Sequence, residues 1–143
     1  MASDIFGKKL FEEGLAARKA WMGEAYVERA FANADADFDL PVQEFVTATA
    51  WGRVWSQSVL PRKNISLQTL CLLAALNRPT DFETHFRAAR RNGCTVEELR
   101  DTLLQITAYC GAPAGLEAFR IGKKVLAEEK AAEAGKAATQ PKP

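Results

Sequence analysis

His85 is the only histidine of the chain, and it lies in a segment with the pattern of a helix, PTDFETHFRAARRNG. Phe82, His85, Phe86 and Ala89 are spaced i, i+3, i+4 and i+7, so they share one face of that helix. Histidine has an ordinary pKa close to neutrality and often donates or accepts a proton in catalysis. A histidine on an apolar face is either a packed core residue or a catalytic acid, and the spacing alone fits both.

The segments around His85 predict the elements that would position it. Leu70–Leu76 reads LCLLAAL and has no polar side chain. It is far shorter than the ~20 residues that span a bilayer, so we expect a central helix that is buried on all sides. Pro79 ends that helix. Thr80 and Glu83 have the spacing of a capping box, which predicts the start of the His85 helix at Thr80, and Gly93 is a C-cap glycine.

The rest of the chain carries helical patterns and no convincing strand. We predict an all-α fold of about seven helices in one domain over residues 1–129, followed by a disordered tail over residues 130–143. The remaining expected helices are Lys8–Met22, Glu24–Asn33, Asp39–Trp55, Thr95–Tyr109 and Ala114–Lys130, with Asp39 as an N-cap, Pro41 in the first turn and Thr95–Glu98 as a second capping box.

Composition excludes several classes of protein. The 143 residues are 48% hydrophobic and 26% charged with a net charge of +1, which is ordinary for a globular protein and gives no basic footprint for nucleic acid or anionic membrane.

Cys71, Cys94 and Cys110 form no CxxC pair, so we expect reduced structural cysteines and no metal. The N-terminus lacks a signal peptide, so a cytoplasmic location is expected. Burial of eight phenylalanines, three tryptophans and an all-apolar helix favours a homo-oligomer.

Three separated motifs resemble the carboxymuconolactone decarboxylase family. They are AWGRVW at Ala50–Trp55, LPRK followed by SLQTLCLLAALNR up to Arg78, and HFRAARRNGCTVEELRDTLLQITAYCGAPAGLEAFR at His85–Arg120. The resemblance implies an alkylhydroperoxidase-D-like all-α fold, no cofactor, and a hexamer built from trimers. Redox members of that superfamily carry a CxxC ahead of the matching histidine. Arg78 and Asp81 occupy those two positions here, which excludes the peroxidase chemistry.

The resemblance also implies an activity, the decarboxylation of γ-carboxymuconolactone in the β-ketoadipate branch of aromatic catabolism. Loss of CO₂ releases electrons into the conjugated lactone, so no metal or pyridoxal is required. The protein must hold two carboxylates, stabilise the charge on the lactone oxygen and deliver one proton. His85 is the expected proton donor, and the expected substrate of the protein is a small lactone carboxylate.

Other site candidates each have a plainer explanation. Trp51 and Trp55 are spaced i, i+4 and could wall a pocket or simply pack. Glu44 lies seven residues before Trp51 and occupies a position where the family has a glutamate. It could orient His85 or be a surface residue. Arg62 in the LPRK loop could bind a substrate carboxylate through its planar guanidinium, although a surface arginine is as good an explanation.

Two further candidates lie after His85 in the sequence. Cys110 matches the family's tyrosine–cysteine–glycine turn and is expected to be a small buried hydrophobe beside the site. Glu117 matches a family acid and could contact substrate or form an ion pair between subunits.

Three positions depart from the family pattern. Arg53 replaces an acid, while Ile65 and Ala48 stand where decarboxylases tend to have arginine. Arg53 could compensate for a lost arginine as a substrate-binding residue. Equally, the chain could act on another lactone or aromatic-derived acid, or be a non-catalytic helical oligomer in which His85 only packs.

Overall fold

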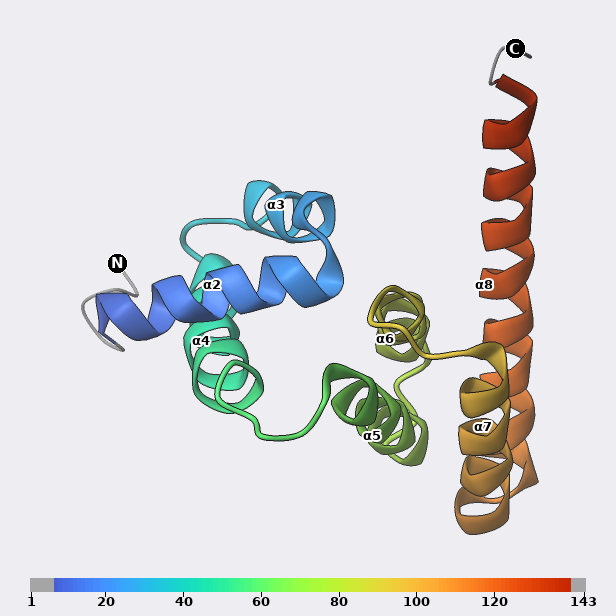
Figure 1. Ribbon diagram of the computed structural model, residues 1–143. Coiled ribbons are helices and arrows are strands. Elements are labelled where there is room, and N and C mark those ends of the chain that lie inside the picture. Colours follow the sequence, from blue (N-terminus) through green and yellow to red (C-terminus); the bar gives the residue numbers. More distant parts are fainter. Residues whose placement is uncertain (1–6, 140–143) are drawn as a thin grey trace. The chain divides into compact units, whose positions relative to one another are not determined.

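The structure is a computed structural model that describes residues 7–139, and it confirms the all-α fold (Figure 1). Seven α-helices and one π-helix make up the described part of the chain, which contains no strand. The elements are α2 (Lys8–Met22), α3 (Glu24–Ala32), α4 (Leu40–Val46), the π-helix η1 (Thr47–Trp55), α5 (Arg62–Ala75), α6 (Pro79–Arg91), α7 (Val96–Cys110) and α8 (Ala112–Thr139). The contacts divide the chain into two compact units, Met1–Ile65 and Ser66–Pro143, which are described separately below.

In the first unit, helix α2 packs closely on η1 at two glycines. A Cβ at Gly14 would overlap the carbonyl oxygen of Thr47 and lie 2.8 Å from the backbone nitrogen of Gly52. A Cβ at Gly52 would overlap the carbonyl oxygen of Leu10. Because the obstructing atoms belong to the backbone, any side chain at either glycine would push the two helices apart.

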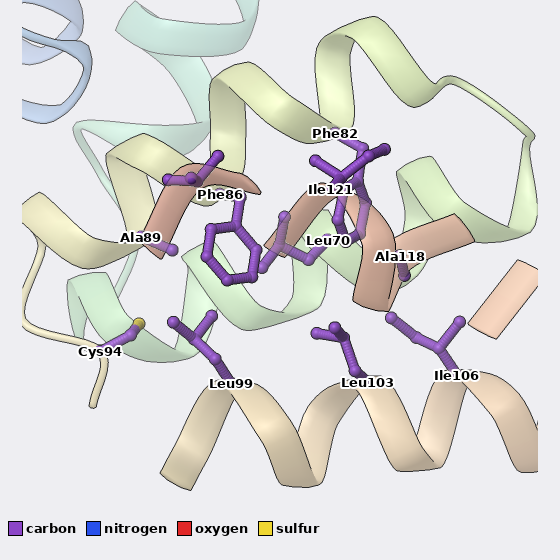
Figure 2. Packing of buried hydrophobic residues seen from close by; sticks show 11 residues of the cluster. Leu70, Phe82, Phe86, Ala89, Cys94, Leu99, Leu103, Ile106, Ala118 and Ile121 are labelled. Carbon is purple, nitrogen blue, oxygen red and sulfur yellow. The ribbon is translucent and has the colours of Figure 1, made fainter. Parts of the chain in front are cut away.

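The second unit has its own apolar core, which Figure 2 shows from close by. Helices α5, α6, α7 and α8 all contribute to it. Its members from these four helices, and from the turn after α6, include Leu70, Phe82, Phe86, Ala89, Cys94, Leu99, Leu103, Ile106, Ala118, Ile121 and Val125. Phe82 and Phe86 are almost fully buried, so the apolar face predicted for the His85 helix is confirmed.

The predicted capping boxes had different outcomes. Thr95 accepts from the backbone N–H of Glu98 and the Glu98 carboxylate accepts from the Thr95 N–H, so that capping box is confirmed. The box predicted at Thr80 is wrong, because α6 begins one residue earlier, at Pro79. Proline suits the first turn since it has no N–H to satisfy. Glu83 instead accepts from Arg87 (2.7 Å) and from Lys124 (2.9 Å) of α8.

Asp39 lies at the N-cap position of α4 with Pro41 in the first turn, as predicted. Its carboxylate, however, does not cap the helix and accepts the backbone N–H of Asp35 instead. The acidic connection between α3 and α4 therefore folds on itself, and Asp35 also accepts the N–H groups of Asp37 and Phe38.

The apolar run Leu70–Leu76 is helical up to Ala75 but is not buried on all sides within the chain. Leu70 is fully buried, whereas Leu72 is 62% exposed and Leu76 is 64% exposed. Only one face of α5 can contact the core of the second unit. The sequence could not distinguish burial inside the chain from burial against another molecule, because both select apolar residues.

The end of the chain also differs from the prediction. Helix α8 begins at Ala112 rather than Ala114 and continues to Thr139, whereas we expected it to end at Lys130. Residues 131–136 are exposed, so strong helix formers rather than packing maintain this extension. The N-terminal residues used to exclude a signal peptide lie partly outside the described residues.

Candidate active site

His85 lies on α6 at the edge of its buried apolar face. The neighbouring Phe82 and Phe86 are buried, while the imidazole is half-buried. Burial lowers the pKa of His85, because desolvation disfavours the imidazolium, and the carboxylate of Asp81 one turn earlier partly opposes that change. A bound anion could raise the pKa of this half-buried imidazole and favour its protonated form, which suits it to proton transfer.

An aromatic cluster dominates the first unit and contains all three tryptophans of the chain. The ring centroids are 4.4 Å apart for Trp51 and Trp55, 4.7 Å for Trp21 and Trp55, and 6.5 Å for Trp21 and Trp51. Trp21 and Trp51 are buried, whereas Trp55 is half-buried. The predicted neighbours Trp51 and Trp55 are thus brought together. Trp21 was missed as a site candidate because its contacts depend on how α2 packs against η1.

Arg62 joins this aromatic cluster. Its guanidinium carbon lies 5.1 Å from the centroid of the Trp21 ring, which is the geometry of a cation–π contact. The prediction of a loop at Arg62 is wrong, because α5 begins there. Pro61 starts the helical ladder, and its carbonyl accepts the N–H of Ile65. Stacking on Trp21 restricts an exposed guanidinium that could still bind a carboxylate through two parallel hydrogen bonds.

Arg18 is a buried cation that the sequence analysis did not select. It donates to the hydroxyl of Thr47 at 3.0 Å and to the side-chain carbonyl of Gln43 at 2.8 Å. Burial lowers the pKa of Arg18, and Tyr26 partly offsets this. These hydrogen bonds fix α2 to the junction of α4 and η1. The signal in the sequence was a charged residue among Leu15, Trp21 and other apolar residues on one face of a helix.

The winding of η1 changes how Glu44 relates to the tryptophans. The N–H of Ser56 bonds to the carbonyl of Trp51, five residues earlier. A spacing of seven residues places Glu44 and Trp51 on one face only if the helix is α-helical throughout. The chain changes to π-winding between these two residues. Glu44 is half-buried on α4 and belongs to the first unit, while His85 belongs to the second. An orienting contact of Glu44 with His85 stays a prediction.

Cys110 and Glu117 line one pocket of the second unit, with a volume of about 350 Å³ and Phe82 in its wall. Cys110 is exposed at the end of α7, so its predicted burial is wrong. Glu117 accepts from Arg120 at 2.8 Å, and that guanidinium lowers the pKa of the carboxyl. His85 does not line this pocket, although it shares α6 with Phe82.

Comparison with known proteins identifies the chain's relatives. The carboxymuconolactone decarboxylase family matches residues 41–124. The chain is 39% identical over 124 residues to nitrosuccinic acid decarboxylase npaB of Metarhizium robertsii, covering 87% of this chain and 86% of that protein. It is 37% identical over 116 residues to 4-carboxymuconolactone decarboxylase of Acinetobacter baylyi, covering 81% and 86%. The chain belongs to the carboxymuconolactone decarboxylase family.

The residues expected to depart from the family pattern differ in their burial. Ala48 is fully buried and Ile65 is 9% exposed, so both positions carry apolar packing residues here. Arg53 is exposed on η1. Arg53 and Arg62, the two basic residues predicted to bind substrate, are both exposed to solvent.

No group of three or more histidine, cysteine, aspartate or glutamate side chains within residues 7–139 is arranged to hold a metal ion. Among the helices that the structure describes, none has the length and apolar character needed to cross a membrane.

Proposed function

We propose that this family member is a decarboxylase of a small organic dicarboxylic acid, with His85 as the proton donor and without a metal or organic cofactor. The observation that carries the proposal is the half-buried His85, whose pKa is lowered, beside Phe82 and Phe86 in a chain that is similar to two decarboxylases. The bond between the leaving carboxyl and the substrate carbon breaks, and CO₂ departs. The electron pair moves into an acceptor group, and the imidazolium then protonates the carbanion.

The two acids named for the relatives suggest what the acceptor must be. In 4-carboxymuconolactone, the leaving carboxyl stands on a saturated ring carbon that a C=C bond links to the lactone carbonyl, so the electron pair released on loss of CO₂ is delocalised onto that carbonyl. In nitrosuccinic acid, a nitro group stands on the carbon that bears a carboxyl. Each compound has two carboxyl groups and its own electron sink. A site that holds two carboxylates and supplies a proton suits both reactions, since the substrate itself stabilises the carbanion.

We propose 4-carboxymuconolactone or a closely related lactone acid as the first substrate to test, as part of aromatic compound catabolism. Arg62, stacked on Trp21, and the exposed Arg53 are the proposed carboxylate ligands, and Trp51 and Trp55 form the proposed apolar wall. Nitrosuccinic acid is the second candidate, supported by the 39% identity to its decarboxylase and by the buried apolar residues at positions 48 and 65.

A comparison of the two acids tests the substrate. Purified protein is incubated with each, and substrate loss and product mass are followed over time. We expect kcat/KM to be at least about tenfold higher for one acid, since a site built for one anion leaves polar groups unpaired with the other. Arg62→Lys keeps the charge but removes the planar group, and it should raise KM for the preferred acid. Turnover of neither acid would overturn the substrate proposal.

The pH dependence should report His85. Because burial lowers the pKa of His85 below its ordinary 6.5, kcat/KM should fall as the pH rises through that lower pKa in the free protein. A bound dianion favours the imidazolium, so the corresponding fall in kcat should occur at higher pH. Initial rates from about pH 5 to pH 8 separate the two limbs. A kcat/KM that increases with pH over this range would contradict a proton donor.

We also propose that the protein is a homo-oligomer, with a hexamer as the expected state. Leu72 on α5 and Leu76 directly after that helix leave apolar surface exposed, as do Tyr109 and Leu116 in the second unit. Light scattering at micromolar concentration should give the mass of several chains, and the double substitution Leu72→Glu, Leu76→Glu should reduce it. Val59→Glu, at an exposed position of the first unit, is the control. The mass of one chain for the unmodified protein would contradict the assembly.

A further inference from the structure

A second concave site lies entirely in the second unit, and none of the residues proposed for catalysis or substrate binding lines it. This groove, which we call the α7–α8 groove, has a volume of about 440 Å³, within the usual range for small-molecule sites. Its walls come from α7 and α8, and Phe86 of α6 also contributes. None of the residues that line the groove belongs to the aromatic cluster of the first unit.

The inner surface of the groove is apolar. Leu99 and Leu103 of α7 are buried at its base, and Phe119 and Leu126 of α8 are half-buried along it. Helix α8 lies close to α6 at Gly122, because a Cβ there would lie 3.0 Å from the Phe86 ring. An alkyl chain or a ring could therefore be buried against these side chains.

The charged residues that line the groove are all basic. They are Arg100 on α7 and Lys123 and Lys130 on α8, and no acidic side chain lines the groove. Arg100 pairs with Asp101 at 3.2 Å, outside the groove lining. Within the described residues, Lys123 and Lys130 have no ion-pair partner. An anionic head group beside these basic residues would gain favourable interactions that a neutral or cationic one would not.

We propose that the α7–α8 groove binds an amphipathic organic acid, with its alkyl or aryl part against Leu99, Leu103 and Phe119 and its carboxylate near Lys123 and Lys130. The apolar side chains that line the groove and its exclusively basic charged residues together specify this class of ligand. A dicarboxylate such as the proposed substrates would leave one charged group against the apolar base, so the groove is selective for acids with one anionic end.

Decanoate is the probe, and calorimetric titration of the full-length protein measures its binding. We expect one decanoate per chain, and octanoate to bind more weakly by about fourfold per methylene removed. Decanol and decyltrimethylammonium have the same chain without the negative charge and should bind at least about threefold more weakly. Added salt should weaken decanoate binding and leave decanol binding unchanged.

Two sets of variants test the location. Lys123→Glu with Lys130→Glu should weaken decanoate binding by at least about threefold. Lys8→Glu with Lys9→Glu makes the same change in net charge on α2 and should have no effect on it. Ala127→Phe, at an exposed position of α8 that lines the groove, should abolish binding by filling the groove while thermal unfolding stays cooperative.

Several results would overturn the proposal. They are absence of decanoate binding, equal binding of decyltrimethylammonium, or decanoate affinity that Ala127→Phe leaves unchanged. Light scattering tests one further alternative. If Ala127→Phe changes the oligomer mass and decanoate does not bind, a second copy of the chain occupies the groove and the small-molecule site is wrong.

Discussion

Replacing His85 with alanine should lower kcat for the native acid by about 10²–10⁴-fold while KM changes little. In the proposed reaction, the protein delivers one proton to a delocalised carbanion, and His85 is the proposed donor. Removing the imidazole should therefore affect the transition state and leave the proposed carboxylate contacts of Arg62 and Arg53 in place. Steady-state rates measured with the preferred acid give both parameters.

Three measurements separate catalysis from packing at His85. Thr84→Ala is the matched control, since Thr84 is the preceding residue of α6 and its hydroxyl donates to the carbonyl of Thr80. Its kcat should be unchanged. Circular dichroism and oligomer mass of His85→Ala should match the unmodified protein. If His85→Ala unfolds or dissociates, His85 is a core residue. If it folds and turns over normally, another residue is the acid, and Glu44 is the next candidate.

Gly14→Ala should lower the free energy of unfolding of the first unit by about 3 kcal/mol. The added methyl group would overlap the backbone carbonyl of Thr47, and a backbone atom cannot move aside as a flexible side chain can. Helices α2 and η1 would have to separate, which would also disturb the contact of Trp21 with Trp51. Urea unfolding followed by tryptophan fluorescence reports this unit, because all three tryptophans lie in it.

Gly135→Ala is the control for that substitution. No atom lies within 4 Å of a Cβ at Gly135, so alanine should be neutral or stabilise α8 by up to about 1 kcal/mol. Activity gives a second measurement, since separating α2 from η1 should also raise KM if Trp51 and Trp55 line the substrate pocket. A Gly14→Ala protein as stable as the unmodified one would contradict the close packing of α2 on η1.

Local signals in the sequence predicted the order and most of the ends of the helices. The Thr95 capping box, the C-cap at Gly93 and the break between the expected helices Thr95–Tyr109 and Ala114–Lys130 were readable because each depends on neighbouring residues. The Thr80 box failed because Pro79 offers a competing helix start one residue earlier. Where two local signals overlap, spacing alone does not decide between them.

Features that depend on tertiary contacts were not readable in the same way. No residue pattern in TATAWGRVW predicts a π-helix. The π-winding occurs where η1 approaches α2 closely, at Gly14 and Gly52. The contacts of Trp21, Arg18 and Arg62 arise from the same packing. The sequence therefore identified Trp51 and Trp55 as neighbours and missed the third tryptophan and the buried cation.

CO₂ release by chelator-treated protein decides whether the chain is a decarboxylase that needs no metal. Protein dialysed against EDTA is mixed with 4-carboxymuconolactone or with nitrosuccinic acid, and CO₂ is quantified against substrate consumed. We expect one CO₂ per molecule of the preferred acid for the unmodified protein and a rate lower by about 10²–10⁴-fold for His85→Ala. Absence of CO₂ from both acids, or activity that returns only when a metal is added, would contradict this expectation.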